Sequence, residues 1–258
     1  MSASDNKDLA AGRMEKIGLL LRGRHIARVN ELCRELGASP ASIRRDLVEM
    51  ERRGLLQRVH GGAVFNDNRA DEPLFDDKAA IAAKEKQRIA EAALRFVKPS
   101  DSIFLDGGST VLALARLLAD MTQLTVVTNS LRVAGTLAGS GPKTILVGGE
   151  LRRLSQTFVG SLTKCMIDQI HLDQAFMGTI GLTEAEITTT DPAEAYTKEL
   201  VMRRARQVIL LADSSKIGKA SFVRAGALED VDVLVTDSGA AQKDVKQFRK
   251  KGIKVVVA

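Results

Sequence analysis

The chain has 258 residues, of which 45% are hydrophobic and 27% are charged. This composition supplies enough apolar material for a folded core and excludes an intrinsically disordered chain. No apolar run approaches the roughly 18 residues of a membrane-spanning helix, and the N-terminus lacks the apolar stretch of a signal peptide. We therefore expect a cytoplasmic protein with no membrane partner, built from one large domain or two smaller ones.

The cysteines and histidines are few and scattered, at Cys33, Cys165, His25, His60 and His171. Their spacing fits neither a disulfide framework nor a zinc site. We interpret both cysteines as reduced packing residues and expect no metal site.

Positive charge is concentrated at the start of the chain. Residues 1–60 hold 12 Lys and Arg against 8 Asp and Glu, whereas the other residues hold 26 against 24. This asymmetry is compatible with an N-terminal module that binds phosphate groups, although a surplus of this size is also common on solvated surfaces.

Two helices are predicted before residue 37. The first covers Leu9–Leu21, where apolar residues recur at near-helical spacing. After a short extended stretch, His25–Val29, the second covers Asn30–Leu36, with Asn30 as its N-cap and Gly37 as its C-terminal stop.

A third helix follows after only two residues and has the clearest start signal. Ser39 can accept a hydrogen bond from the first turn, Pro40 fits the first helical position, and the helix ends at Gly54. One face carries an apolar stripe for packing, formed by Ile43, Leu47 and Met50.

The opposite face of this third helix carries Ser42, Arg44 and Arg45 near the helix N-terminus. Guanidinium groups at this position can reach DNA phosphates or the edges of guanine bases. The segment Leu55–Ala63 then reads as a strand, a glycine turn and a returning strand, which together form a wing. Arg58 and His60 of the wing would lie beside the DNA, where Arg58 contacts phosphate.

The string Ser39-Pro-Ala-Ser-Ile-Arg-Arg-Asp-Leu47, followed by Glu51-Arg-Arg-Gly-Leu-Leu-Gln-Arg-Val-His-Gly-Gly-Ala63, resembles the signature of the DeoR family of bacterial regulators. The resemblance implies a winged helix-turn-helix over residues 9–65 that binds double-stranded operator DNA. It implies DNA-binding roles for Ser39, Ser42, Arg44, Arg45, Arg58 and His60. Ser42 stands where the family usually has threonine, so the hydroxyl is kept.

The second half of the chain begins after a polar linker at residues 66–77, which contains Pro73. A long helical stretch is predicted over Lys78–Val97. Short β-rich runs then alternate with helical segments, which indicates a mainly parallel sheet covered by helices, a Rossmann-like α/β domain over residues 78–258. The predicted strands are Ile103–Leu105, Leu124–Thr128, Thr144–Val147, Gln174–Met177, Val208–Ala212, Val231–Thr236 and Ile253–Val257.

Polar residues follow several of these strands, and ligands of open α/β sheets bind beyond the carboxyl ends of the strands. In Asp106-Gly-Gly-Ser-Thr110, two glycines allow close approach of the backbone, and Ser109 and Thr110 open a helix whose N–H groups favour an anion. The nucleotide-binding patterns GxGxxG and GxxxxGK[ST] are missing from the sequence. We therefore expect a small phosphorylated ligand and no cofactor.

The resemblance to the DeoR family extends to these strand ends. The sensor domain of that family is similar in fold to ribose-5-phosphate isomerase and glucosamine-6-phosphate deaminase, which implies a sugar phosphate as effector. The implied effector site consists of Asp106, Gly107, Gly108, Ser109, Thr110, Asn129, Gly149, Lys198, Asp213 and Lys216. From the residues alone, Asp106 and Asp213 could equally cap helices, and Lys198 could be a solvated helix lysine. Glu186 stands where the family tends to have glycine, which would alter the pocket if its loop lined it.

These observations favour a homodimeric or larger repressor of a carbohydrate-metabolism operon, released from DNA when the sugar phosphate binds. An enzyme related to sugar-phosphate isomerases is one alternative, but no acidic residue follows the strand ending at Met177, and we expect no catalytic residues. A regulator whose C-terminal domain only oligomerises is the other.

Overall fold

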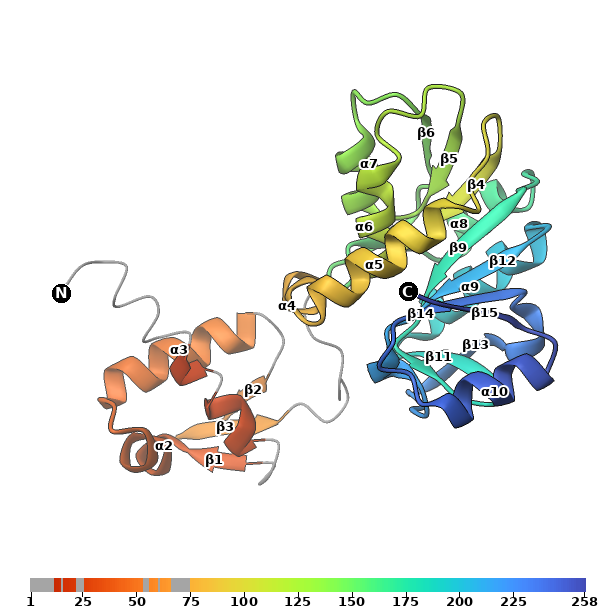
Figure 1. The fold of residues 1–258 in the computed structure, drawn as a ribbon. Helices are drawn as coiled ribbons and strands as arrows, with labels where there is room; N and C mark the ends of the chain where they lie inside the picture. The colour runs from red at the N-terminus through yellow and green to blue at the C-terminus, as the bar shows by residue number, and fades with distance from the viewer. Residues whose placement is uncertain (1–11, 15, 22–25, 53–55, 60, 66–74) are drawn as a thin grey trace. The chain divides into compact units, whose positions relative to one another are not determined.

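The computed structural model describes residues 12–14, 16–21, 26–52, 56–59, 61–65 and 75–258. The chain divides into two compact units, Met1–Asp71 and Glu72–Ala258, which are described one at a time (Figure 1).

The N-terminal unit is a winged helix-turn-helix. A three-stranded antiparallel sheet in the order β1-β3-β2 carries the wing. The predicted extended stretch before the second helix forms strand β1 of this sheet, which pairs with β3. The elements are helical residues 12–14 and 16–21, β1 (Ile26–Arg28), α2 (Val29–Leu36), α3 (Pro40–Arg52), β2 (Leu56–Val59) and β3 (Gly62–Phe65).

Helix α3 begins as predicted, because the backbone N–H of Ser42 donates to Ser39 Oγ over 3.2 Å. Its predicted apolar stripe is buried in the core of this unit. The predicted start of α2 at Asn30 is wrong by one residue. Arg28 is the N-cap, its backbone N–H donates to the Glu31 carboxylate over 2.9 Å, and buried Val29 opens the helix. Gly54 lies outside the described residues.

The first helical segment and α3 are joined by an ion pair that sequence reasoning missed. Asp46 is buried on α3 and accepts two hydrogen bonds from the Arg13 guanidinium, at 2.5 and 3.2 Å. A two-point contact fixes the relative orientation of the two groups as well as their separation. The carboxylate therefore orients α3 against the rest of the unit.

The C-terminal unit is built on a seven-stranded parallel sheet in the order β15-β14-β12-β9-β4-β5-β6. Each of the seven predicted runs forms a strand of this sheet, which confirms the predicted architecture. The strands are β4 (Ser102–Leu105), β5 (Thr125–Thr128), β6 (Lys143–Leu146), β9 (Gln174–Gly178), β12 (Val208–Leu211), β14 (Val233–Thr236) and β15 (Lys254–Val257).

Helices cover both faces of the sheet, because successive side chains of a strand point to opposite faces. On β4, Ile103 and Leu105 belong to one core cluster and Phe104 to the other. The first face is covered by α4 (Phe75–Ala80), α5 (Ala83–Leu94), α6 (Ser109–Leu117) and α7 (Leu131–Leu137), and the second by α8 (Ser161–Ile167), α9 (Pro192–Arg204) and α10 (Gln242–Lys250) (Figure 1). None of the helices among the described residues has the length and apolar character needed to cross a membrane.

The predicted long helix over Lys78–Val97 is two helices. Helix α4 begins at Phe75, inside the expected linker, because this aromatic side chain is buried in the core. The chain turns at Ala82, whose φ of 53° lies in the left-handed region that alanine disfavours, and α5 starts at the next residue.

Five short strands were not predicted. They form a hairpin, β7 (Glu150–Arg152) with β8 (Thr157–Val159), and a small antiparallel sheet of β10 (Gly181–Leu182), β11 (Glu186–Thr189) and β13 (Val223–Ala227). Both lie in connections between strands of the main sheet.

Replacing Asp46 by Ala should lower the free energy of unfolding of the N-terminal unit by about 2 kcal/mol, because Arg13 would keep a partly buried charge without its carboxylate. Chemical denaturation followed by circular dichroism measures this. The control is Glu49→Ala, which removes an ion pair with the exposed Arg52 and should change stability by less than about 0.5 kcal/mol. Equal effects of the two variants would contradict the role given to Asp46.

Candidate functional site

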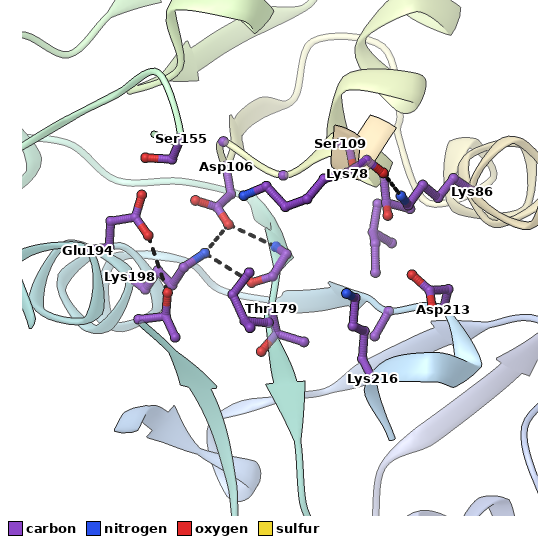
Figure 2. Close-up of a pocket in the computed structure, with 18 of the residues that line it drawn as sticks. Lys78, Lys86, Asp106, Ser109, Ser155, Thr179, Glu194, Lys198, Asp213 and Lys216 are labelled. Carbon is purple, nitrogen blue, oxygen red and sulfur yellow. Dashed lines mark hydrogen bonds and ion pairs between the residues drawn. The ribbon is translucent and has the colours of Figure 1, made fainter. Parts of the chain in front are cut away.

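A pocket lies at the carboxyl edge of the parallel sheet, where β4, β9 and β12 end (Figure 2). It contains most of the residues that the sequence singled out as an effector site. Those that line it are Asp106, Gly107, Gly108, Ser109, Thr110, Lys198, Asp213 and Lys216.

The start of α6 forms one wall of this pocket. Gly108 is the N-cap, and its carbonyl accepts the first helical hydrogen bond, from Leu112, over 2.9 Å. The N–H groups that precede Leu112 in the first turn of α6 therefore have no acceptor within the helix, and the helix dipole favours an anion there. A side chain at Gly107 would place its Cβ 2.0 Å from Thr157 Cγ2, so glycine is required for β8 to close the pocket.

An ion pair crosses the pocket between β4 and α9. Lys198 Nζ donates to Asp106 Oδ2 and to the carbonyl of Gly178 (3.0 Å), and Asp106 Oδ2 also accepts from the Gly178 backbone N–H (2.9 Å). The Lys198 side chain is 11% exposed, so its interpretation as a solvated helix lysine is wrong. Asp106 does not cap α6, because its carboxylate is bound at the end of β9 instead.

Asp213 and Lys216 lie on the loop after β12. The Asp213 carboxylate accepts from the backbone N–H of Ser215 (3.1 Å) and from its hydroxyl, which caps the 3-10 turn η2 (Ser214–Lys216). Its interpretation as a cap is therefore confirmed. The Lys216 ammonium points into the pocket (Figure 2) and has no hydrogen bond or ion pair to any residue in the described part of the chain.

Sequence reasoning missed the buried Glu194 of α9. Its carboxylate accepts from Thr157 (2.9 Å) and Thr189 (3.2 Å) and lies 3.3 Å from an Arg152 guanidinium nitrogen. A start signal for α9 was available, because an aspartate N-cap at Asp191 precedes a proline at the first helical position. That signal would have placed Glu194 and Lys198 one turn apart on one helix face.

Two lysines of the α4–α5 segment were also missed. Lys86 is 6% exposed, and its Nζ donates to the carbonyls of Lys78 and Ile81, the second over 2.6 Å. Burial lowers the pKa of Lys86, and the nearby Asp213 carboxylate opposes this shift. Figure 2 shows the Lys78 side chain reaching across the pocket toward Asp106.

Three residues that the sequence associated with the ligand do not line the pocket. Asn129 Nδ2 donates to the carbonyl of Phe158 (3.0 Å) and so holds β8. A Cβ at Gly149 would lie 2.4 Å from Thr163 Oγ1 and 2.6 Å from a backbone oxygen, so this glycine allows close packing of β7. Glu186 begins β11 opposite Ala227, and Thr189 at the other end of that strand lines the pocket instead.

The N-terminal unit offers a second candidate surface, on the solvent side of α3. Arg44 and Arg45 are exposed, and neither forms an ion pair with a residue in the described ranges. Ser42 lies beside Ser39, with their hydroxyls 3.0 Å apart. Arg58 of the wing is held by Glu51 of α3 over 2.7 Å, and its backbone and side-chain donors lower the pKa of Glu51. The predicted contact of His60 lies outside the described residues.

Both units match known protein families. Residues 13–69 match the model of the DeoR-like helix-turn-helix domain, and residues 81–238 match that of the DeoR C terminal sensor domain. The lactose phosphotransferase system repressor of Streptococcus mutans is 37% identical over 229 residues, which cover 87% of this chain and 91% of that protein. The HTH-type transcriptional regulator GlpR of Haloferax volcanii is 34% identical (96% and 98% covered), and the putative aga operon transcriptional repressor of Escherichia coli O157:H7 is 30% identical (95% and 93% covered).

Among solved structures, ribose 5-phosphate isomerase a from Methanocaldococcus jannaschii aligns with a TM-score of 0.38 and 18% identity, covering 51% of this chain and 53% of that one.

Replacing Gly149 by Ala should destabilise the C-terminal unit by about 2 kcal/mol, because the new methyl group overlaps Thr163 and the backbone at Val159, and φ is 155°. Chemical denaturation measures the loss. Gly148→Ala is the matched control, since a Cβ there meets no atom within 4 Å. A Gly149→Ala protein with unchanged stability would contradict this packing role.

Proposed function

The chain belongs to the DeoR family of transcriptional regulators, and we propose that it represses a carbohydrate-metabolism operon and leaves its operator when a sugar phosphate binds. The observation that carries this proposal is the pocket at the carboxyl edge of the sheet, where the α6 N-terminus and the Lys216 ammonium face the same space. Two relatives support a role as a repressor of a carbohydrate operon, because they are named as a lactose phosphotransferase system repressor and a putative aga operon transcriptional repressor.

The DNA-binding half of the proposal places the start of α3 in the major groove. Arg44 and Arg45 are exposed there, with side chains long enough to reach base edges or phosphates. Ser39 and Ser42 lie at the same end of α3 and can donate their hydroxyls to the DNA backbone. Arg58 keeps its pairing with Glu51 while its remaining N–H groups face a phosphate.

We propose that the two walls of the pocket bind different parts of the ligand. The phosphate would accept from the first turn of α6, from the Ser109 and Thr110 hydroxyls and from Lys216. The sugar hydroxyls would reach the opposite wall, where Ser155, Thr157 and Glu194 present oxygen atoms. A ligand with an anionic end and a hydroxyl-rich end fits both walls.

We further propose that the protein acts in the cytoplasm as a homodimer or larger homo-oligomer, so that two winged units contact two half-sites of one operator. Sugar-phosphate binding would favour an arrangement that fits the half-sites less well.

The pocket favours binding over catalysis. A general base needs a carboxylate that can reach a substrate proton. Asp106 already accepts from Lys198 and Gly178, and Glu194 from two threonines with an arginine beside it. Carboxylate oxygens that already accept from these partners are not free to reach a substrate proton.

Replacing Arg44 and Arg45 together by Ala should weaken DNA binding by about a hundredfold or more, because each arginine loses a base or phosphate contact. The measurement is fluorescence anisotropy with a duplex that the wild-type chain selects from a random pool. Arg52→Ala, at the far end of α3, is the matched control and should bind nearly as well. Unchanged affinity of the double variant would place the recognition surface elsewhere.

Replacing Lys216 by Met should lower the affinity for a sugar phosphate about tenfold or more while DNA binding is kept, since a charged hydrogen bond is lost. Thermal shift against pentose, hexose, amino-sugar and polyol phosphates measures this. Exposed Lys219, on the same loop and outside the pocket, gives the control Lys219→Met. A shift with none of these ligands would favour a domain that only oligomerises, and turnover of one would favour an enzyme.

A further inference from the structure

The α4–α5 segment, residues 75–86, contributes Lys78, Ile81 and Lys86 to the pocket. It is also the first part of the C-terminal unit along the chain, so the DNA-binding unit is covalently attached to its N-terminal end. One short segment thus lines the ligand pocket and begins where the connection to the DNA-binding unit ends.

Helix α4 is held at both of its ends by side chains from elsewhere. At its N-terminal end, Phe75 is buried under the Arg132 guanidinium, 5.5 Å from the ring centre, and Arg132 also binds Asp76 at 2.8 and 3.1 Å. At its C-terminal end, the Lys86 ammonium donates hydrogen bonds to the carbonyls of Lys78 and Ile81. The turn between α4 and α5 runs through the left-handed Ala82, which local backbone preference opposes. Contacts at the two ends therefore keep α4 in place.

Lys86 is the contact that a ligand can change. An ammonium group has three N–H donors, and the two carbonyls use two of them. The group is buried, and it shares the pocket with Asp213, which raises its pKa, and with Lys216, which lowers it. A phosphate beside Lys216 could accept the third donor while the two carbonyl bonds persist.

We propose that Lys86 is a ligand-sensing residue: a phosphate in the pocket binds its remaining donor, fixes α4 in the position observed, and so restrains the chain that leads to the DNA-binding unit. This inference rests on the proposed function, because it requires an anion in the pocket. It goes beyond that function by naming residues 75–86 as the segment that would couple ligand binding in the pocket to the DNA-binding unit.

The test is hydrogen exchange of the full chain with inorganic phosphate, compared with potassium chloride of equal ionic strength. At phosphate ten times its dissociation constant, backbone amides within residues 75–86 should exchange up to about tenfold more slowly. Strand β6 is the internal reference, since none of its residues lines the pocket. Lys86→Met should remove this slowing and raise the phosphate dissociation constant about tenfold. Lys84→Met, an exposed lysine on the same helix, should behave as wild type.

The outcomes separate this inference from the proposed function. Phosphate binding that Lys216→Met weakens, with no slowing in residues 75–86 of the wild type, overturns the role of Lys86 and leaves the pocket standing. Slowing that persists in Lys86→Met also overturns it. No phosphate effect on the wild type overturns both. Should Lys86→Met fail to fold, the wild-type exchange decides alone.

Discussion

The parallel direction of β4, β9 and β12 is the constraint on which the pocket depends. Neighbouring parallel strands end at the same edge, so segments far apart in sequence meet there. The last backbone groups of such strands still need partners, and side chains at the edge supply them. Asp106 accepts from the N–H of Gly178, and Lys198 donates to its carbonyl. Part of the polar lining therefore completes the sheet, whereas Lys216 has no such partner among the described residues.

The main elements could be predicted because their signals are local. An apolar run in a central parallel strand and a serine-proline helix start are read without knowledge of the rest of the fold. The hairpin and the small sheet have strands of 2 to 5 residues, whose pairing depends on distant partners such as β13 for β11. The same holds for the break at Ala82, since tertiary contacts there override a continuous helical pattern.

Which of the strand-end residues line the pocket could not be predicted from the sequence, for a related reason. A glycine or an amide after a strand can serve a ligand or the packing of the chain, and the sequence pattern is the same in both cases. Their positions separate them: Gly107 lines the pocket, whereas Gly149 and Asn129 lie outside its lining and support β7 and β8. Lys86 did carry a signal. It shares a helix face with the buried Ile89, Ala90 and Ala93, a position where a charge requires a specific partner.

The charges of the pocket determine what can occupy it. Asp106 is matched by Lys198, Glu194 by hydroxyls and Arg152, and Asp213 by the turn that it caps. The Lys216 ammonium has no such partner among the described residues, and it adds to the burial that lowers the pKa of Lys86. Among the charges that act on the pKa of Lys86, Asp213 has the largest effect and raises it, whereas Lys216 and Lys78 lower it. Of the described residues that line the pocket, four are lysines (Lys78, Lys86, Lys198 and Lys216) and three are carboxylates (Asp106, Glu194 and Asp213), a surplus of one positive charge. A positive surplus attracts an anionic ligand more strongly than a neutral one. The charge arrangement therefore favours the anionic ligand proposed above, and a sugar's hydroxyls would meet the wall of Ser155, Thr157 and Glu194.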